Sequence, residues 1–388
     1  MIKRQYIDIG RRERIPFILA DFLIDNYHKI FKKKQKPLPN LTAPKILIFA
    51  NGHLGDALQM SYLFPLIKMK FPAATIHLVA PSWCDVVWKH NSLIDTVTHL
   101  DEAASNRGKG SKFDKQKIWL NTTQSAIKKL KNEIFDFAID VRYSNHHFLY
   151  LLPFLNIKQT IGYGTRGLGG FLDIELPLPP QPRHNMDWLL QLLEPMGIKE
   201  KTETIVPVFE IPESIKKQVD EKIKNWNIGQ SFYLILPESG AKEKMFNPDF
   251  WVKLMVEKAQ KSPEIQFLIS GLTEYCDQVY AKAQSLLGDK VINLKSQLSI
   301  HEIGVLSEKS QGVYCLDSFP CHLCTIFCPV VAYFQIDHLL FLPINNYPIY
   351  IYHHQNPADW KLMNRKGFHN AQVANFDDIL IKETVFKI

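Results

Sequence analysis

Asp56 is the only carboxylate in a short turn, Asn51–Asp56, that also contains two glycines. A carboxylate in such a turn can accept a proton from a reacting group. The turn follows a continuous apolar run, Ile46–Ala50, typical of a buried parallel strand, and it precedes apolar residues at helical spacing. The pattern predicts a strand, a turn and a helix, with Asp56 at the carboxyl end of the strand, where open α/β sheets bind ligands.

The two glycines of this turn, Gly52 and Gly55, allow its backbone to approach a ligand closely. Their spacing lacks the third glycine of the dinucleotide-binding motif. The acid would also repel a pyrophosphate bound at the start of the helix. The turn therefore counts against a nicotinamide oxidoreductase.

A second stretch has residue types that could take part in chemistry. It is Tyr314–Phe334, which contains Asp317, Ser318, His322 and four cysteines. The cysteine spacing, C-x5-C-x2-C-x3-C, differs from the usual zinc pattern of two close pairs across a longer gap. On a helix the last three would share one face, where buried free cysteine packs as a small hydrophobe. We expect packing, with metal binding as the alternative, for Cys315, Cys321, Cys324 and Cys328.

Cations in the first half of the chain lie where an acidic or phosphorylated substrate could meet them. Arg142 follows the strand-like stretch Phe135–Asp140, Arg166 follows another, and His184 follows a proline-rich segment. Surface salt bridges are the alternative for these cations. His53, inside the first turn, could contact a sugar or only satisfy the carbonyls of the turn.

These residues must be positioned by two series of β/α units. The first series has strands expected near residues 45–50, 75–80, 96–100, 136–141 and 159–163. The second has strands expected near residues 232–237, 265–270, 291–293, 312–316 and 329–334. The connecting segments are a polar loop at 107–117, an extended stretch at 176–182, a helix at 184–196 and a linker at 202–212. A tail, residues 346–388, contains a candidate helix at 376–385.

The composition is that of a globular chain with room for two domains: 388 residues, 46% hydrophobic and 22% charged. No apolar run reaches the length of a membrane span, and the N-terminus lacks the pattern of a signal peptide. Six cysteines without a secretory signal are expected to be reduced, which favours a cytoplasmic protein.

Residues 1–44 form a basic extension. Residues 1–40 hold ten lysines and arginines but only four acids, so most of the net charge of +7 lies here. Apolar residues 15, 18, 19, 22 and 23 have helical spacing, and the basic run Lys32–Lys36 follows. Such a helix suits an anionic membrane surface, as in a peripheral protein at the inner face of a membrane. The alternative is a helix packed on its own domain with a solvated charged face. Nucleic acid is not an expected partner, because the remainder of the chain has no basic stripe.

Together these stretches resemble glycosyltransferase family 9, the ADP-heptose:lipopolysaccharide heptosyltransferases, over about residues 45–340. That family opens with a strand and G-x-x-G-D, as this chain does. The other matching stretches are 71–79, 91–95, 135–140, 161–166, 234–246 and 314–334. The resemblance implies an α/β fold of GT-B architecture, with two Rossmann-like domains that face each other across a cleft. Residues 45–205 would be the acceptor domain and residues 206–345 the donor domain.

The resemblance also implies an inverting, metal-independent glycosyltransferase without a cofactor, in which Asp56 is the general base. The donor would be a nucleotide sugar, with ADP-heptose favoured, and the acceptor a lipid-linked or surface glycan such as lipopolysaccharide. The positions expected to bind the donor are Lys244, Glu274, Asp317, Ser318 and His322, and those expected to bind the acceptor are His53, Arg142, Arg166 and His184. A solvated loop lysine and a first-turn helix charge are the alternatives for Lys244 and Glu274.

Phe319 departs from the family pattern D-[ST]-G-P-x-H-L-A, which has glycine at this position. The phenylalanine ring would stand where a phosphate binds in the family. This leaves open a second class of protein, a non-catalytic GT-B relative that acts as an assembly partner. A sugar-nucleotide epimerase on a similar fold is a third.

Overall fold

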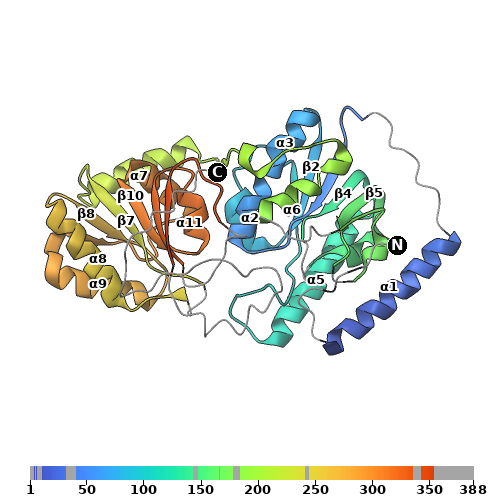
Figure 1. Cartoon of the computed structure of the whole chain (residues 1–388), viewed down its shortest axis with the longest axis horizontal. Coiled ribbons are helices and arrows are strands. Elements are labelled where there is room, and N and C mark those ends of the chain that lie inside the picture. Colours follow the sequence, from blue (N-terminus) through green and yellow to red (C-terminus); the bar gives the residue numbers. More distant parts are fainter. Residues whose placement is uncertain are drawn as a thin grey trace. The chain divides into compact units, whose positions relative to one another are not determined.

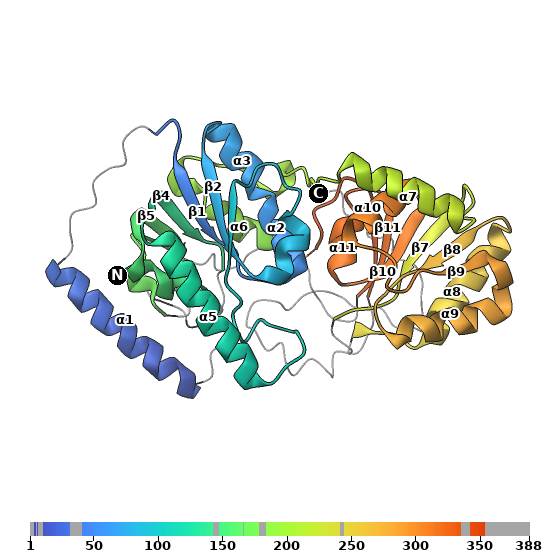
Figure 2. The same cartoon turned by 180° about the vertical axis from the view of Figure 1, so that it is seen from behind.

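The structure, a computed structural model, describes Arg4, Tyr6 and residues 11–31, 41–142, 147–165, 167–177, 184–240, 244–334 and 342–353. The chain divides into two compact units, Met1–Ile205 and Val206–Ile388, and each is described by itself. Figures 1 and 2 show a sheet with helices in each unit. The expected helix at residues 376–385 lies outside the described residues.

The first unit is built on a six-stranded sheet in the order β3-β2-β1-β4-β5-β6, and all neighbouring strands are parallel. Its strands are β1 (Lys45–Phe49), β2 (Thr75–Ala80), β3 (Thr96–His99), β4 (Ile134–Asp140), β5 (Asn156–Tyr163) and β6 (Ile174–Leu176). Its helices are α1 (Arg11–Phe31), α2 (Leu54–Ser61), α3 (Leu63–Lys70), α4 (Asp85–Trp88), α5 (Lys112–Leu130) and α6 (Asn185–Gln191). Short 3-10 turns are η1 (Ser82–Cys84), η2 (Leu149–Phe154), η3 (Gly169–Phe171), η4 (Glu194–Met196) and η5 (Thr202–Thr204).

The second unit repeats this plan with the parallel order β12-β11-β10-β7-β8-β9. Its strands are β7 (Phe232–Leu236), β8 (Gln266–Ile269), β9 (Val291–Asn293), β10 (Gly312–Leu316), β11 (Val330–Phe334) and β12 (Ile349–His353). Its helices are α7 (Glu213–Asn225), α8 (Pro248–Lys261), α9 (Glu274–Leu287), α10 (Ile300–Lys309) and α11 (Phe319–Cys324), with a 3-10 turn η7 (Gly288–Lys290).

Successive residues of each strand in the second unit bury side chains on opposite faces of the sheet, because side chains alternate along a strand. On one face, strand residues such as Leu234 pack with α7, α10 and α11, and the four cysteines 315, 321, 324 and 328 belong to this apolar cluster. On the other face, residues such as Ile235 pack with α8 and α9, and Trp251 is fully buried there. The expected packing role of the four cysteines is confirmed.

Both sheets reverse their strand order at one place, between β1 and β4 in the first unit and between β7 and β10 in the second. At such a reversal the connections leave the two neighbouring strands in opposite directions and open a crevice at their carboxyl ends. Ligands of open α/β sheets bind there. The loops that follow β1, β4, β7 and β10 are therefore the first places to look for functional residues.

The predicted α/β class and the strands of both series are confirmed, and β6 and β12 are additional edge strands. The loop expected at 107–117 is wrong in its second half, because α5 begins at Lys112. The Ser111 hydroxyl accepts the Asp114 N–H, and the Asp114 carboxylate accepts the Ser111 N–H, so the polar stretch forms a helix start. The helix expected at 184–196 ends at Gln191 and is followed by η4.

Helix α1 packs on the first unit through the side that carries Asp21 and Asp25. Arg4 donates hydrogen bonds to both Asp25, on α1, and Glu175, on β6, at 2.7–3.0 Å. Asp21 is only 3% exposed and accepts a hydrogen bond from the Tyr6 hydroxyl. Two glycines allow the close approach of this helix. A Cβ at Gly167 would lie 2.5 Å from Phe17, and one at Gly170 would lie 2.5 Å from Ile24.

The opposite side of α1 carries its apolar stripe. Ile15, Ile18, Leu19, Phe22 and Leu23 are 43–67% exposed. The alternative of a helix packed on its own domain is therefore confirmed in part: α1 does pack on the first unit. Its packed side carries Asp21 and Asp25, however, and these apolar side chains lie outside. Within the described part of the chain, no helix has the length and apolar character needed to cross a bilayer.

We expect Arg4→Met to loosen α1 from the first unit. The change leaves Asp21, Asp25 and Glu175 without their common cation, which costs about 1–3 kcal/mol for partly buried carboxylates. Hydrogen exchange of the α1 amides should accelerate about 10- to 100-fold. Lys158→Met, which breaks a more exposed pair with Asp136, is the control and should leave these amides unchanged. Unaltered α1 exchange in Arg4→Met would contradict the assignment.

Candidate functional site

The strand reversal of the first unit brings Asp56 and Arg142 together. Strands β1 and β4 are neighbours, with Phe49 opposite Asp140, so the loops after them leave the sheet side by side. Asp56 lies in the first turn of α2, and Arg142 comes two residues after β4. Their side chains form an ion pair, with 3.1 Å between Arg142 Nη1 and Asp56 Oδ1. Asp56 is 21% and Arg142 18% exposed, so a ligand can reach both.

The second carboxylate oxygen of Asp56 is held by the turn itself. Oδ2 accepts the backbone N–H of His53, the N-cap residue of α2, at 2.9 Å. A Cβ at position 52 would lie 2.6 Å from the Asp56 Cβ, so glycine is required at Gly52. Burial by itself would raise the pKa of Asp56, but the Arg142 guanidinium and the His53 N–H hold it below its usual range. Asp56 is therefore an ionised carboxylate at neutral pH.

A buried carboxylate, Asp140, fixes the segment that carries Arg142. It accepts the N–H of Arg142 at 3.0 Å and that of Phe148 at 2.8 Å, so it fastens both ends of the loop after β4. Burial raises the pKa of Asp140 to about 7, although these two N–H donors oppose the shift. The sequence analysis assigned Asp140 to a strand and missed this positioning role.

Two further contacts hold the turn after β1. The Trp83 indole N–H donates to the Gly52 carbonyl at 2.9 Å, and the Asn51 amide lies 3.4 Å from Glu102. Trp83 follows β2 and Glu102 follows β3, so each comes from the loop of another strand. Sequence reasoning missed these residues because nothing local connects them to the turn.

The other acceptor candidates of the first unit have different positions. His184 is the N-cap residue of α6; its Nδ1 accepts the Met186 N–H at 3.0 Å, and the side chain is 5% exposed. Its neighbour Asn185 donates to Gln59 of α2 at 2.7 Å, which ties the start of α6 to the helix of Asp56. Arg166 lies outside the described residues. The structure thus places His53 and Arg142 next to Asp56, whereas His184 caps the N-terminus of α6.

The strand reversal of the second unit brings together Lys244 and Asp317. Lys244 follows β7, and Asp317 follows the adjacent strand β10. The Lys244 ammonium lies 2.7 Å from Asp317 Oδ2 and 3.3 Å from the Asp317 carbonyl. Lys244 is 20% exposed and Asp317 8%. Each unit therefore has a partly accessible ion pair at the reversal of its sheet, and Lys244 is a positioned lysine rather than a solvated one.

The short helix α11 follows Asp317 directly. Ser318 is its N-cap residue, and its hydroxyl lies 3.4 Å from the Leu316 carbonyl. Phe319 is the first helical residue, and the helix also contains His322, which is 8% exposed. Phe319 is not one of the described residues that have a left-handed backbone. The backbone of this chain therefore does not require glycine at position 319.

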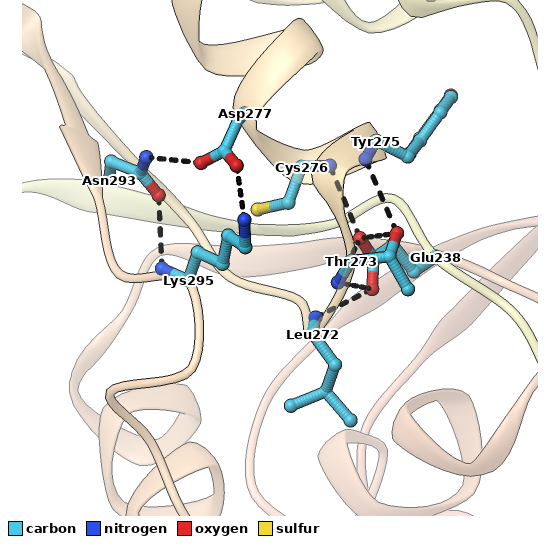
Figure 3. A network of polar contacts seen from close by, with 8 residues as sticks. All are labelled: Glu238, Leu272, Thr273, Tyr275, Cys276, Asp277, Asn293 and Lys295. Carbon is cyan, nitrogen blue, oxygen red and sulfur yellow. Dashed lines mark hydrogen bonds and ion pairs between the residues drawn. The ribbon is translucent and has the colours of Figure 1, made fainter. Parts of the chain in front are cut away.

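The start of α9 is occupied by another carboxylate, Glu238, which follows β7 (Figure 3). Glu238 accepts the N–H groups of Leu272 at 2.6 Å, Thr273 at 3.1 Å and Cys276 at 3.2 Å, and the Thr273 hydroxyl at 2.7 Å. A Cβ at Gly271 would lie 2.5 Å from this carboxylate. Because an acid fills the helix start, a phosphate is not expected there.

Glu274, a donor candidate, is the first residue of α9, next to this cap, and is exposed. Three residues later on α9, Asp277 pairs with Lys295 and accepts a hydrogen bond from the Asn293 amide at 3.2 Å (Figure 3). The sequence pattern indicated Glu274 but not Glu238, although Glu238 follows β7 and Glu274 follows the neighbouring strand β8.

Within the described ranges, no three His, Cys, Asp or Glu side chains are grouped as ligands for a metal ion. All six cysteines are buried free thiols.

Two comparisons with known proteins give matches, and they agree with each other. A family model described as glycosyltransferase family 9 (heptosyltransferase) matches residues 123–361. Similar solved structures include a family 9 glycosyltransferase from Veillonella parvula, with TM-score 0.67 and 16% identity, covering 79% of this chain and 86% of that chain. Another is the Escherichia coli ADP-heptose lps heptosyltransferase II, with TM-score 0.62 and 14% identity over 79% and 89% of the two chains.

A third is the E. coli heptosyltransferase WaaC with ADP, with TM-score 0.58 and 11% identity over 80% of this chain and 91% of that chain. No curated protein sequence gives a match.

Proposed function

Because this chain belongs to glycosyltransferase family 9 and has the GT-B fold class, we propose that it transfers a sugar from a nucleoside diphosphate donor to a glycan acceptor. The observation that carries this proposal is the ionised, partly exposed Asp56 at the strand reversal of the first unit. A base in that position suits the removal of a proton from an acceptor hydroxyl. The first unit would bind the acceptor and the second the donor.

The proposed reaction is an inverting displacement. Asp56 takes the proton of the acceptor hydroxyl as that oxygen forms a bond to the anomeric carbon of the donor. The bond from this carbon to the diphosphate breaks with its electron pair, so the nucleoside diphosphate leaves with an additional negative charge. A single displacement inverts the anomeric configuration and requires one base, in agreement with one accessible carboxylate in the turn after β1.

The second unit would stabilise the leaving group. The Lys244 ammonium is fixed at the strand reversal, where it can offset the charge that develops on the diphosphate. Ser318, the N-cap residue of α11, and His322, within α11, are the additional donors that we propose for the phosphate oxygens. We therefore propose a metal-independent reaction, since a positioned lysine supplies the cationic charge and the sequence has no Asp-x-Asp motif.

ADP-heptose is the donor that we propose, because two similar structures have names that include ADP-heptose or ADP. For the acceptor we propose a lipopolysaccharide-type or other lipid-linked surface glycan, made at the cytoplasmic face of a membrane. Arg142, beside Asp56, suits an acceptor with phosphate or carboxylate groups.

Arg142 is expected to set the acid limb of the pH profile. Asp56 must be ionised to act as a base, so activity is lost as the pH falls through its pKa, which Arg142 lowers. In Arg142→Gln burial remains and the cation is lost, so the limb of kcat/KM should move to higher pH by about 1–3 units. Arg142→Lys retains the charge and should leave the limb near that of the native protein. A lower rate with an unmoved limb in Arg142→Gln would refute this role.

The non-catalytic alternative depends on Phe319, and a nucleotide panel distinguishes it from the transferase. We expect the native chain to bind ADP in a calorimetric comparison of ADP, UDP, GDP and CMP, because Phe319 has helical backbone and is not forced into the space of a glycine. Phe319→Gly should bind ADP with an affinity within about tenfold of the native value. Absence of nucleotide binding by the native chain, with binding restored by Phe319→Gly, would instead favour an assembly partner.

A further inference from the structure

The outer side of α1 is an apolar surface without a cover among the described residues. Its members are Ile15, Ile18, Leu19, Phe22, Leu23 and Ile30, which are 43–74% exposed. The spacing of these residues places them along one side of a helix. A contiguous apolar strip of this length on a protein surface indicates an interaction site.

The charges around this surface favour an anionic occupant. Two acids of α1, Asp21 and Asp25, face the first unit and are paired with Arg4 and Tyr6. They therefore do not offset the basic residues that flank the strip in the sequence, Arg11 and Arg12 at its start and the run of lysines from Lys29 to Lys36 at its end. The exposed apolar strip thus lies between two basic segments of the sequence, with Glu13 as the one acid among them.

We propose that this surface docks the protein onto an anionic lipid bilayer, with α1 lying in the plane of the interface. An apolar side with basic flanks is the combination that inserts into the acyl boundary and attracts acidic headgroups. Arg4, Gly167 and Gly170 hold the helix by its other side, so docking needs no detachment from the first unit.

A second copy of the chain is a less suitable occupant. Two copies joined through this strip would bring together two sets of flanks that are basic in sequence, each with Glu13 as its one acid, and like charges oppose such contact. The inference deepens the proposed function and rests on it for its purpose, because a lipid-linked acceptor would be met by diffusion along the surface. The binding itself is tested without donor or acceptor.

The test is flotation of the full chain with vesicles of phosphatidylcholine alone and of phosphatidylcholine with phosphatidylglycerol. The native chain should bind the anionic vesicles and bind the neutral ones at least about tenfold more weakly. Raising the ionic strength from about 0.1 M to about 1 M shortens the Debye length from about 10 Å to about 3 Å and should weaken binding to the anionic vesicles.

The variant Leu19→Ser/Leu23→Ser should reduce binding to anionic vesicles at least about tenfold, since it removes two leucines from the inserted side. The control is Leu272→Ser/Leu286→Ser, which removes two leucines of the second unit that are 75% and 67% exposed. The control should bind as the native chain does. All these leucines are exposed, so both variants should retain the native circular dichroism and melting temperature.

Equal binding by the two variants, or no binding of the native chain to either vesicle, overturns the proposal. A native dimer in solution that Leu19→Ser/Leu23→Ser converts to a monomer also overturns it, in favour of a second copy as the occupant. Calorimetry with ADP, which needs no vesicle, separates a failure of membrane docking from a failure of the proposed transferase.

Discussion

Asp56→Asn is expected to lower kcat/KM by about 10²- to 10⁴-fold, the usual contribution of a general base. Asparagine has the shape of aspartate, and its amide oxygen can still accept the His53 N–H that now bonds to Oδ2. What it lacks is the charge that pairs with Arg142 and the ability to take a proton. The measurement is the release of nucleoside diphosphate from the donor in the presence of acceptor, together with calorimetry of ADP, whose affinity should be unchanged.

The matched control is Asp114→Asn. Asp114 has the same place in the first turn of α5 that Asp56 has in α2, and it also accepts the N–H of the N-cap residue. Loss of helix capping is thus common to both variants, whereas only Asp56 is paired with Arg142 at a strand reversal. Asp114→Asn should retain native turnover. Similar activity in the two variants would exclude Asp56 as the base.

Lys244→Met is expected to weaken ADP binding by about 10- to 100-fold. A hydrogen bond to a charged group contributes about 1.5–3 kcal/mol, and about 1.4 kcal/mol corresponds to a factor of ten. Removal of the ammonium also takes the Lys244 cation from Asp317, whose negative charge would then repel a diphosphate at the strand reversal. Calorimetry of ADP measures the effect. Lys282→Met, which breaks an exposed pair with Asp249 in the same unit, is the control.

A double variant separates two explanations of that loss. If Lys244 contacts the diphosphate, Lys244→Met/Asp317→Asn should remain weak, because no cation has been restored. If Lys244 only neutralises Asp317, removing both charges should recover native affinity. Recovery would remove Lys244 from the proposed donor site while leaving the proposed base untouched.

Local pattern was sufficient to predict the strands and the turn of Asp56. Ile46–Ala50 is a continuous apolar run because β1 is buried on both faces of a parallel sheet, and the glycines beside it identify the sharp turn. The loop expected at 107–117 failed for a local reason as well. Its lysines and arginine resemble a solvated loop, but the cap formed by Ser111 and Asp114 starts a helix within them.

The contacts of the site could not be derived from local pattern. Arg142 meets Asp56 only because β4 is inserted beside β1, and Asp317 meets Lys244 only because β10 is inserted beside β7. Strand order depends on the packing of the whole unit, which no window of the sequence contains. The place of His184 after a proline-rich segment suggested a ligand contact but gave no sign of the helix cap that the structure adds.

Helix α1 shows the same limit for an amphipathic pattern. The spacing of the apolar residues predicted the helix and its stripe, but not which side would pack. That side was decided by Arg4, 21 residues before Asp25 and 171 before Glu175, and by two glycines that admit the helix closely. A hydrophobic stripe indicates a surface that prefers to leave water, whereas the identity of its partner is set by distant residues.

The buried thiols give each unit its own chemical reporter of opening. Cys84 is in the first unit and the other five cysteines are in the second. Burial raises the pKa of Cys276 and Cys328 to about 12 and raises that of Cys84 as well. Because only the thiolate reacts readily, alkylation of the native protein should proceed through transient unfolding. A nucleotide bound by the second unit would then slow the alkylation of its five thiols and leave the alkylation rate of Cys84 unchanged.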